Sequence, residues 1–391
     1  MKTRTQFAAL TTLLLVVSLL SLNAPALAES EAVGATYLSA ATVPTNMPGI
    51  NTYPEPPKGF NPLTASDLEL AGYGFPQRPD KATDPDHYAM WERAMQAAKI
   101  RSTAKLRPAH TNGRSVPSMG LSSSLPAEQV ATHPLAAIQS HNDNAAGVFL
   151  NNKLKKWGSA SFSDIWTAIT VPVQQMPFAN HGCTDAWYTT QSIVGFDPII
   201  FEDAANGHPI FFPEEFAGVS EDLFCSTGQA YYDAVIGWET FGTDVFSLNP
   251  GDVFYTELHA FGGCNAGSVF VEDLTTLVYN SYTMSNPCGS SQTGRVAYWF
   301  VTRPLAGSGI DGESPLNNTI SISFDGAQVN TVAGKPFYPG SQASTTTVLT
   351  MYDDTDSQAI ELVNQGATGF QGLHSLFFQT TGCAFAGGCT R

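Results

Sequence analysis

Residues 296–304 read VAYWFVTRP, and this stretch predicts a β-strand that is buried on both sides. Side chains alternate along an extended chain, so one face carries Val296, Tyr298, Phe300 and Thr302 and the other carries Ala297, Trp299 and Val301. Neither set is polar enough to face water. The strand therefore lies between two layers, or one of its faces lines a groove. Tyr298 is accordingly a residue of the core or of a functional site.

Short β-rich segments of the same kind recur from about Ala145 to the end of the chain. Examples are FSDIWTAITVP, AYYDAVIGW, VFYTELHAF, GSVFVED and TTVLTMY, with turn sequences such as Asn-Pro-Gly-Asp at 249–252 between them. Many short strands at regular spacing, with no convincing helix, predict an antiparallel sandwich or barrel. We therefore predict one all-β domain over residues 141–391, which is long enough for a sizeable core.

The first 140 residues are expected to be organised differently. Residues 1–28 combine basic residues, a short apolar run and a small-x-small end, which predicts a secretory signal peptide cleaved after Ala28. Residues 29–140 are predicted to be a pro-segment-like region of mostly irregular chain, with one amphipathic helix at about 85–101 that begins at Asp84 and Pro85. Because no later apolar run could span a bilayer, we predict a secreted protein with no membrane partner.

Charge is divided unevenly along the chain. Residues 157–391 hold 23 acidic and four basic residues, so this domain repels nucleic acid and anionic lipid, and neither is expected as a partner. Residues 93–114 hold six basic residues and no acidic one. This basic run is predicted to cover the acidic domain until its carboxylates protonate, or else to be a solvated linker.

Cysteine usage agrees with an exported protein. The six cysteines all lie in the second half of the chain, at Cys183, Cys225, Cys264, Cys288, Cys383 and Cys389. We expect disulfides between consecutive members of this series (183 with 225, 264 with 288, 383 with 389), although six thiols allow other pairings. The chain has no CxxC pair and no HExxH helix, and its GxGxxG-like run at 307–312 opens no helix, so neither a metal nor a cofactor is expected.

The order of the β-rich segments resembles that of the eqolisin, or glutamic peptidase, family. The more specific pieces are LNPGD at 248–252 and GSVFVEDLTT at 267–276, and YGFPQRPD at 73–80 resembles the N-terminal segment of bacterial members. The resemblance implies a concanavalin-A-like double sheet, secretion with a pro-segment, and cleavage of proteins in acid by a glutamine and a glutamate. In such a pair the carboxyl group activates water, and the amide donates hydrogen bonds to the developing oxyanion.

The same resemblance implies that the catalytic positions of this chain are substituted. Tyr298 stands where the family has its glutamate, and a phenol with a pKa near 10 cannot act as a base in acid. The position of the family glutamine falls on Glu215 in one alignment and on Glu202 in another. Asp197 and Trp238 match site positions that are retained.

Two hypotheses about function follow. In the first, the protein is not proteolytic and binds a polypeptide, a polysaccharide or its own N-terminal segment, with Asp197, Trp238, Trp299 and Tyr298 as contacts unless these aromatic side chains fill the core. In the second, it is an acid endopeptidase with a relocated acidic pair, built from Glu202 or Glu215 with Asp197 or another carboxyl group of the groove. A carboxyl group within hydrogen-bonding reach of Tyr298 favours the enzyme, whereas an apolar floor around Tyr298 favours binding.

Overall fold

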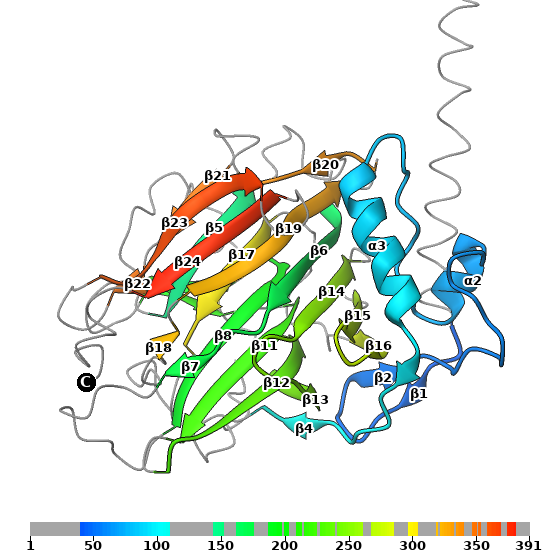
Figure 1. Ribbon diagram of the computed structural model, residues 1–391, viewed down its shortest axis with the longest axis horizontal. Helices are drawn as coiled ribbons and strands as arrows, with labels where there is room; N and C mark the ends of the chain where they lie inside the picture. Colours follow the sequence, from blue (N-terminus) through cyan, green and yellow to red (C-terminus); the bar gives the residue numbers. More distant parts are fainter. Residues whose placement is uncertain are drawn as a thin grey trace, which may run out of the picture.

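The computed structural model is a sandwich of two mostly antiparallel β-sheets with a short helical segment against the outer face of one of them (Figure 1). It confirms the predicted all-β architecture. The predicted signal peptide and all six cysteines lie outside the described residues. The structure describes residues 40–109, 144–151, 162–175, 187–197, 199–202, 209–212, 215–224, 227–238, 241–260, 267–284, 296–303, 318–319, 321–331, 334–339, 346–349, 351–352, 358–368 and 374–380.

The larger sheet, sheet A, has twelve described strands, most of them in the order β1-β2-β16-β15-β14-β6-β19-β24-β23-β22. Strand β20 pairs with β19, and β3 pairs with β16. The strands are β1 (Val43–Pro44), β2 (Ile50–Thr52), β3 (Ile100–Arg101), β6 (Phe162–Thr170), β14 (Val253–Ala260), β15 (Gly267–Asp273), β16 (Val278–Met284), β19 (Ser321–Thr331), β20 (Pro336–Phe337), β22 (Met351–Tyr352), β23 (Gln358–Thr368) and β24 (His374–Thr380).

The smaller sheet, sheet B, has eight described strands in the order β21-β5-β17-β8-β11-β12-β13-β4. They are β4 (Arg107–Pro108), β5 (Ala145–Asn151), β8 (Trp187–Phe196), β11 (Glu215–Phe224), β12 (Gln229–Trp238), β13 (Phe241–Ser247), β17 (Val296–Thr302) and β21 (Thr346–Leu349). Two further strand pairs lie outside the sheets: β9 (Ile199–Glu202) with β10 (Pro209–Phe212), and β7 (Gln174–Gln175) with β18 (Asn318–Thr319).

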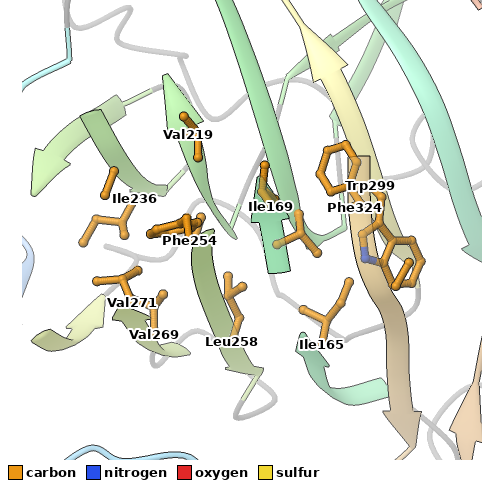
Figure 2. Close-up of a cluster of buried hydrophobic side chains, with 14 of the residues drawn as sticks. Ile165, Ile169, Val219, Ile236, Phe254, Leu258, Val269, Val271, Trp299 and Phe324 are labelled. Atoms are coloured by element: carbon orange, nitrogen blue, oxygen red, sulfur yellow. The ribbon is translucent and has the colours of Figure 1, made fainter. Parts of the chain in front are cut away.

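The main core lies between the inner faces of the two sheets and follows from the alternation of apolar side chains. Ile165 and Ile169 on β6, Leu258 on β14 and Trp299 on β17 are fully buried in it. Figure 2 shows several of these side chains, including the indole of Trp299. The alternation expected for VAYWFVTRP is confirmed, because Trp299 belongs to this core while Tyr298 belongs to a separate cluster on the outer face of sheet B.

A second core lies between the outer face of sheet A and the N-terminal segment. Helix α3 (Pro85–Ala97) buries Met90, Trp91 and Met95 against this face, and α2 (Asp67–Gly72) lies beside it (Figure 1). The facing side chains are Trp166, Ala168, Tyr255, Phe270 and Tyr279 of sheet A and Leu274 of the turn after β15. The helix expected at about 85–101 is therefore present, but it ends at Ala97 because the chain then pairs with β16 as β3.

The N-terminal segment also contributes strands, which the sequence did not indicate. Strand β2 pairs with β16 and β1 pairs with β2, so residues expected to be an irregular lead extend one edge of sheet A. At the other end of the segment, β4 pairs with β13 at the edge of sheet B. Within the described residues, no helix is long and apolar enough to cross a membrane.

Candidate functional site

The outer face of sheet B holds the position that the sequence singled out. Tyr298 is 0 % exposed, and its ring stacks on Phe300 with a centroid distance of 4.7 Å. Its hydroxyl donates to the backbone carbonyl oxygen of Glu215 over 3.2 Å. It belongs to a buried hydrophobic cluster whose other members are Ala109, Ala145, Phe149, Ile193, Phe216, Val235, Phe300 and Leu349.

The side chain of Glu215 lies on the opposite face of the same sheet. Glu215 pairs in register with Phe196, whose ring belongs to the core between the sheets. Its carboxyl group occupies the space that a Cβ atom on Gly267 of sheet A would need. The structure thus brings Glu215 and Tyr298 together only through a backbone carbonyl group, and it does not bring the carboxyl group to the phenol.

The residue of this strand that shares the face of Tyr298 is Phe216. Successive residues of a strand point to opposite faces of the sheet. An alignment shifted by one residue therefore replaces the phenyl ring of Phe216 with the carboxyl group of Glu215 on the face of Tyr298. Gly195, which pairs with both Tyr298 and Phe216, leaves room for the phenol, since a Cβ atom there would overlap the Tyr298 hydroxyl group and the Glu215 carbonyl group. The signal in the sequence is the alternation of side chains along EFAGVSEDLF, which puts Glu215 and Phe216 on opposite faces.

The other predicted site residues lie in different places. Asp197 directly follows β8 and has a positive φ of 47°; its carboxylate accepts a hydrogen bond of 2.9 Å from the backbone N–H of Val296, so it joins two strand ends. Trp299 is 0 % exposed in the core between the sheets. Trp238 ends β12 and Glu202 ends β9, and the structure describes their backbones but not their side chains.

A polar region lies on the same face of sheet B, toward the other end of β8 and β11. The hydroxyl of Thr189 donates to Asp222 over 2.6 Å, and the hydroxyl of Ser220 donates to the same carboxylate over 3.3 Å. Gln191 pairs in register with Ser220 and is 6 % exposed. A carboxyl group and an amide therefore lie on neighbouring strands of one face, although no hydrogen bond joins them among the described contacts.

A group of five neighbouring ionisable side chains lies on the outer face of sheet A, at the N-terminal end of α3. We call it the acid–imidazole row: Asp84, His87, Glu257, His259 and Asp164, in that spatial order. His87 Nδ1 lies 3.4 Å from Asp84, and His87 Nε2 lies 3.2 Å from Glu257 Oε2. His259 Nε2 lies 3.7 Å from Glu257 Oε1, and His259 Nδ1 contacts Asp164 Oδ1.

The strand register explains why these side chains meet. Glu257 and His259 are two residues apart on β14, so they share a face, and His259 is paired with Asp164 on β6. His87 comes from the first turn of α3 and stacks on Trp166, the β6 partner of Glu257, with a centroid distance of 4.6 Å and an interplanar angle of 10°. Asp84 precedes the helix but forms no side-chain cap hydrogen bond, and its carboxylate instead accepts one from the amide of Gln328.

Burial and charge act in opposite directions on the two imidazoles. Burial lowers the pKa of His87, but the charge of Glu257 and the hydrogen bond of Asp84 outweigh it and raise this pKa to about 9. The pKa of His259 is raised in the same way: burial lowers it, but the charge of Asp164 and its contact with the ring raise it by more. Burial would raise the pKa of Asp164, yet the neighbouring His259 holds it below its usual value.

Three members of the row could hold a metal ion. The candidate ligand atoms of Asp164, Glu257 and His259 all lie within 4.8 Å of one another. The sequence reading expected no metal because it looked for cysteine pairs and helical histidine motifs. The available signal was Glu257-Leu258-His259 in a predicted strand, where residues two apart present their side chains on one face.

A further buried carboxyl group, that of Glu272, lies on the same face of sheet A. Glu272 on β15 pairs with Tyr255 and Tyr279, both of which belong to the core beneath the N-terminal segment. It is 0 % exposed, and neither carboxyl oxygen has a hydrogen-bond partner among the described residues. Burial raises its pKa well above the usual value, helped by Asp273 and opposed by Lys99 and Arg93.

Replacing Glu272 with glutamine is expected to make the protein more stable at pH 7–8 and to change little at pH 4. A carboxyl group whose pKa is raised by folding contributes stability below its unfolded pKa of about 4.5, and this contribution is lost as the pH rises, by up to roughly 1.4 kcal/mol per pH unit. Thermal unfolding of both proteins between pH 4 and 8 measures the difference. The exposed carboxyl group of Glu55 provides the control, Glu55→Gln, which should follow the wild type. A parallel pH dependence in Glu272→Gln and the wild type would contradict the prediction.

Comparisons with known proteins give structural neighbours only. No family model and no curated protein sequence matches this chain. Among solved structures, scytalido-glutamic peptidase bound to a transition-state analogue inhibitor has a TM-score of 0.44 and 16 % identity, covering 61 % of this chain and 98 % of that one. SCP-B, a member of the eqolisin family in complex with the tripeptide Ala-Ile-His, has a TM-score of 0.43 and 15 % identity over the same shares of the two chains.

A third neighbour is aspergilloglutamic peptidase from Aspergillus niger, with a TM-score of 0.36 and 21 % identity, covering 50 % of this chain and 99 % of that one.

Proposed function

We propose that this protein is a secreted, glutamic-peptidase-like β-sandwich that binds an extended polypeptide on the outer face of sheet B and does not cleave it at Tyr298. The observation that carries the proposal is the surroundings of Tyr298. Its ring belongs to a buried cluster of aliphatic and aromatic side chains, its hydroxyl donates to the backbone carbonyl of Glu215, and the carboxyl group of Glu215 points to the other side of the sheet. A general base needs a pKa near the working pH, and a phenol, whose ordinary pKa is about 10, cannot serve as one in acid.

The choice of a polypeptide over a polysaccharide rests on how the chain itself approaches this face. Strand β4 adds to the edge of sheet B through β13, and Arg107 forms an ion pair of 2.8 Å with Asp233. The next residue after β4, Ala109, donates its N–H to Gly242 over 3.0 Å and packs its methyl group into the cluster around Tyr298. Addition of an extended segment to a sheet edge is a common mode of peptide recognition. The N-terminal segment thus offers a pattern for how a polypeptide would reach this face from the sheet edge.

The proposal predicts binding of a peptide without its cleavage. The probe is a labelled peptide with the sequence of residues 100–109, added in trans at about pH 3.5, near the pKa of carboxyl groups. We expect saturable binding by fluorescence polarisation and no peptide fragments by mass spectrometry after prolonged incubation. The variant Arg107→Ala should bind the peptide about two- to five-fold more tightly. The protein's own strand β4 competes with the added peptide, and loss of the Arg107–Asp233 ion pair weakens the attachment of β4 by no more than about 1 kcal/mol. Lys105→Ala is the matched control, since Lys105 is exposed and should leave the affinity unchanged.

A second candidate function, an acid endopeptidase, is supported by Gln191 and Asp222 on the same face. In this case purified protein at about pH 3.5 would cut a denatured protein substrate, and Asp222→Asn would abolish the cleavage. Such a result would overturn the proposal. So would saturable binding of an oligosaccharide in place of the peptide, or the absence of peptide binding in both the wild type and Arg107→Ala.

A further inference from the structure

The acid–imidazole row contains a group of three side chains that converge from two paired strands. Asp164 on β6 and Glu257 and His259 on β14 project from the outer face of sheet A, and their candidate ligand atoms lie within 4.8 Å of one another. His259 lies between the two carboxylates: one ring nitrogen contacts Asp164, and the other lies 3.7 Å from Glu257 Oε1. A histidine binds one ion through a single ring nitrogen, and two atoms bound to one tetrahedral ion at about 2.0–2.1 Å lie roughly 3.3 Å apart, so the three side chains would have to close from separations of up to 4.8 Å.

Each carboxylate of this group is held by its second oxygen, which leaves the first one directed at the imidazole. Oε2 of Glu257 accepts hydrogen bonds from the Tyr255 hydroxyl over 2.7 Å and from His87 over 3.2 Å, while Oε1 faces His259. Oδ2 of Asp164 accepts from the hydroxyl of Ser163, while Oδ1 faces His259. Outer hydrogen bonds of this kind orient the ligands of protein metal sites.

The row needs positive charge that lysine and arginine do not supply. Three carboxylates, those of Asp84, Asp164 and Glu257, lie in the row, and none forms an ion pair with a lysine or arginine of the described residues. Glu257 and His259 are nearly inaccessible, with side-chain exposures of 1 % and 6 %. Buried carboxylates require a cation, which here is either the proton on each imidazole or a metal ion. The side chain of Asp164 is 21 % exposed, so the group opens to solvent at that end.

We propose that Asp164, Glu257 and His259 bind one divalent first-row transition metal ion, with Zn²⁺ as the ion that these donors fit best. One imidazole and two carboxylates are borderline to hard ligands. This composition disfavours Cu⁺, which prefers thiolates, and it disfavours Ca²⁺, which takes six to eight oxygen atoms. Three protein ligands leave a position for water on the side of Asp164. A bound ion would also fasten β6 to β14 and, through the hydrogen bond of His87 to Glu257, stabilise the start of α3.

Metal titration of the chelator-treated, full-length secreted chain tests this proposal. Isothermal titration with ZnCl₂ is expected to show one site that Glu257→Gln and His259→Gln each weaken at least 100-fold. Tyr255→Phe keeps the ring but removes the hydroxyl that holds Glu257, and it should weaken the site about 10- to 100-fold. Asp325→Asn is the matched control, because Asp325 is also a buried carboxylate of sheet A but accepts from Ser323 and Ser375 outside the row. It should bind Zn²⁺ as the wild type does.

Two further readouts separate loss of the site from loss of the fold. Circular dichroism without metal should show that the variants are folded, and Zn²⁺ should raise the unfolding temperature of the wild type and of Asp325→Asn but not that of Glu257→Gln. Histidines elsewhere in the chain would bind Zn²⁺ equally in all variants, so the difference between proteins is the measured quantity. Equal Zn²⁺ binding by the wild type and Glu257→Gln would overturn the proposal and would mean that protons alone neutralise the row. Peptide binding on sheet B should be unchanged in these variants, so the two proposals can fail separately.

Discussion

Replacing Trp299 with alanine is expected to lower the free energy of unfolding by about 3 to 5 kcal/mol. The indole is 0 % exposed and lies between the sheets, where Trp299 pairs in register with Val148 on one side and Val194 on the other. Removal of this side chain loses its transfer free energy and leaves a cavity that two hydrogen-bonded sheets cannot close. Urea denaturation followed by circular dichroism measures the loss.

Two variants make this prediction specific to core packing. Trp299→Phe should cost much less than alanine, because the indole N–H has no hydrogen-bond partner among the described residues and phenylalanine removes that buried donor. Val173→Ala changes a side chain that is 63 % exposed and should stay within about 0.5 kcal/mol of the wild type. If Trp299→Ala kept its stability and lost only ligand affinity, Trp299 would be a binding contact, as the sequence hypothesis allowed.

The architecture could be predicted because its signals are local. Alternation over residues 296–302 placed Trp299 and Tyr298 on opposite faces, and the Asp-Pro start with apolar residues at helical spacing located α3. Strands β1, β2 and β3 could not be found in this way. They are two or three residues long, and they exist because β16 offers a free edge to a segment more than 170 residues earlier in the chain. Such pairing leaves no periodic pattern in the short segment.

Individual site residues are also hard to predict when their partners are distant in the sequence. Alternation separates Tyr298 from Trp299, but the choice of Glu215 as its partner needs the strand register to within one residue, and in the structure Phe216 belongs to the cluster of the phenol. Glu257 and His259 were visible as alternate residues of one strand. Their partners were not, since Asp164 and His87 lie 95 and 170 residues away in sequence from the side chains they contact. Long-range partners of this kind come from tertiary packing alone.

Replacing Trp91 with alanine is expected to destabilise the whole sandwich, by about 3 to 5 kcal/mol, and not the N-terminal segment alone. Trp91 is 0 % exposed, and its indole N–H donates to the carbonyl oxygen of Pro76 over 3.1 Å. The guanidinium of Arg78 lies 5.2 Å from the ring centroid. This one side chain therefore joins α3, the preceding loop and the second core. Thermal unfolding combined with limited trypsin digestion measures the effect, with Leu68→Ala, a half-exposed residue of α2, as the control.

The way in which this variant unfolds tests whether residues 40–109 behave as a removable pro-segment. Removal of the segment would expose Trp166, Tyr255, Phe270 and Tyr279 and would leave the edge of β16 unpaired. Exposed aromatic side chains and an open strand edge both favour aggregation. We therefore expect one cooperative transition at a lower temperature, with trypsin cleavage of the segment and loss of the sheets occurring together. A stable sandwich that survives cleavage of the segment would contradict this prediction and would support the pro-segment hypothesis, because the core between the sheets would then be sufficient for folding.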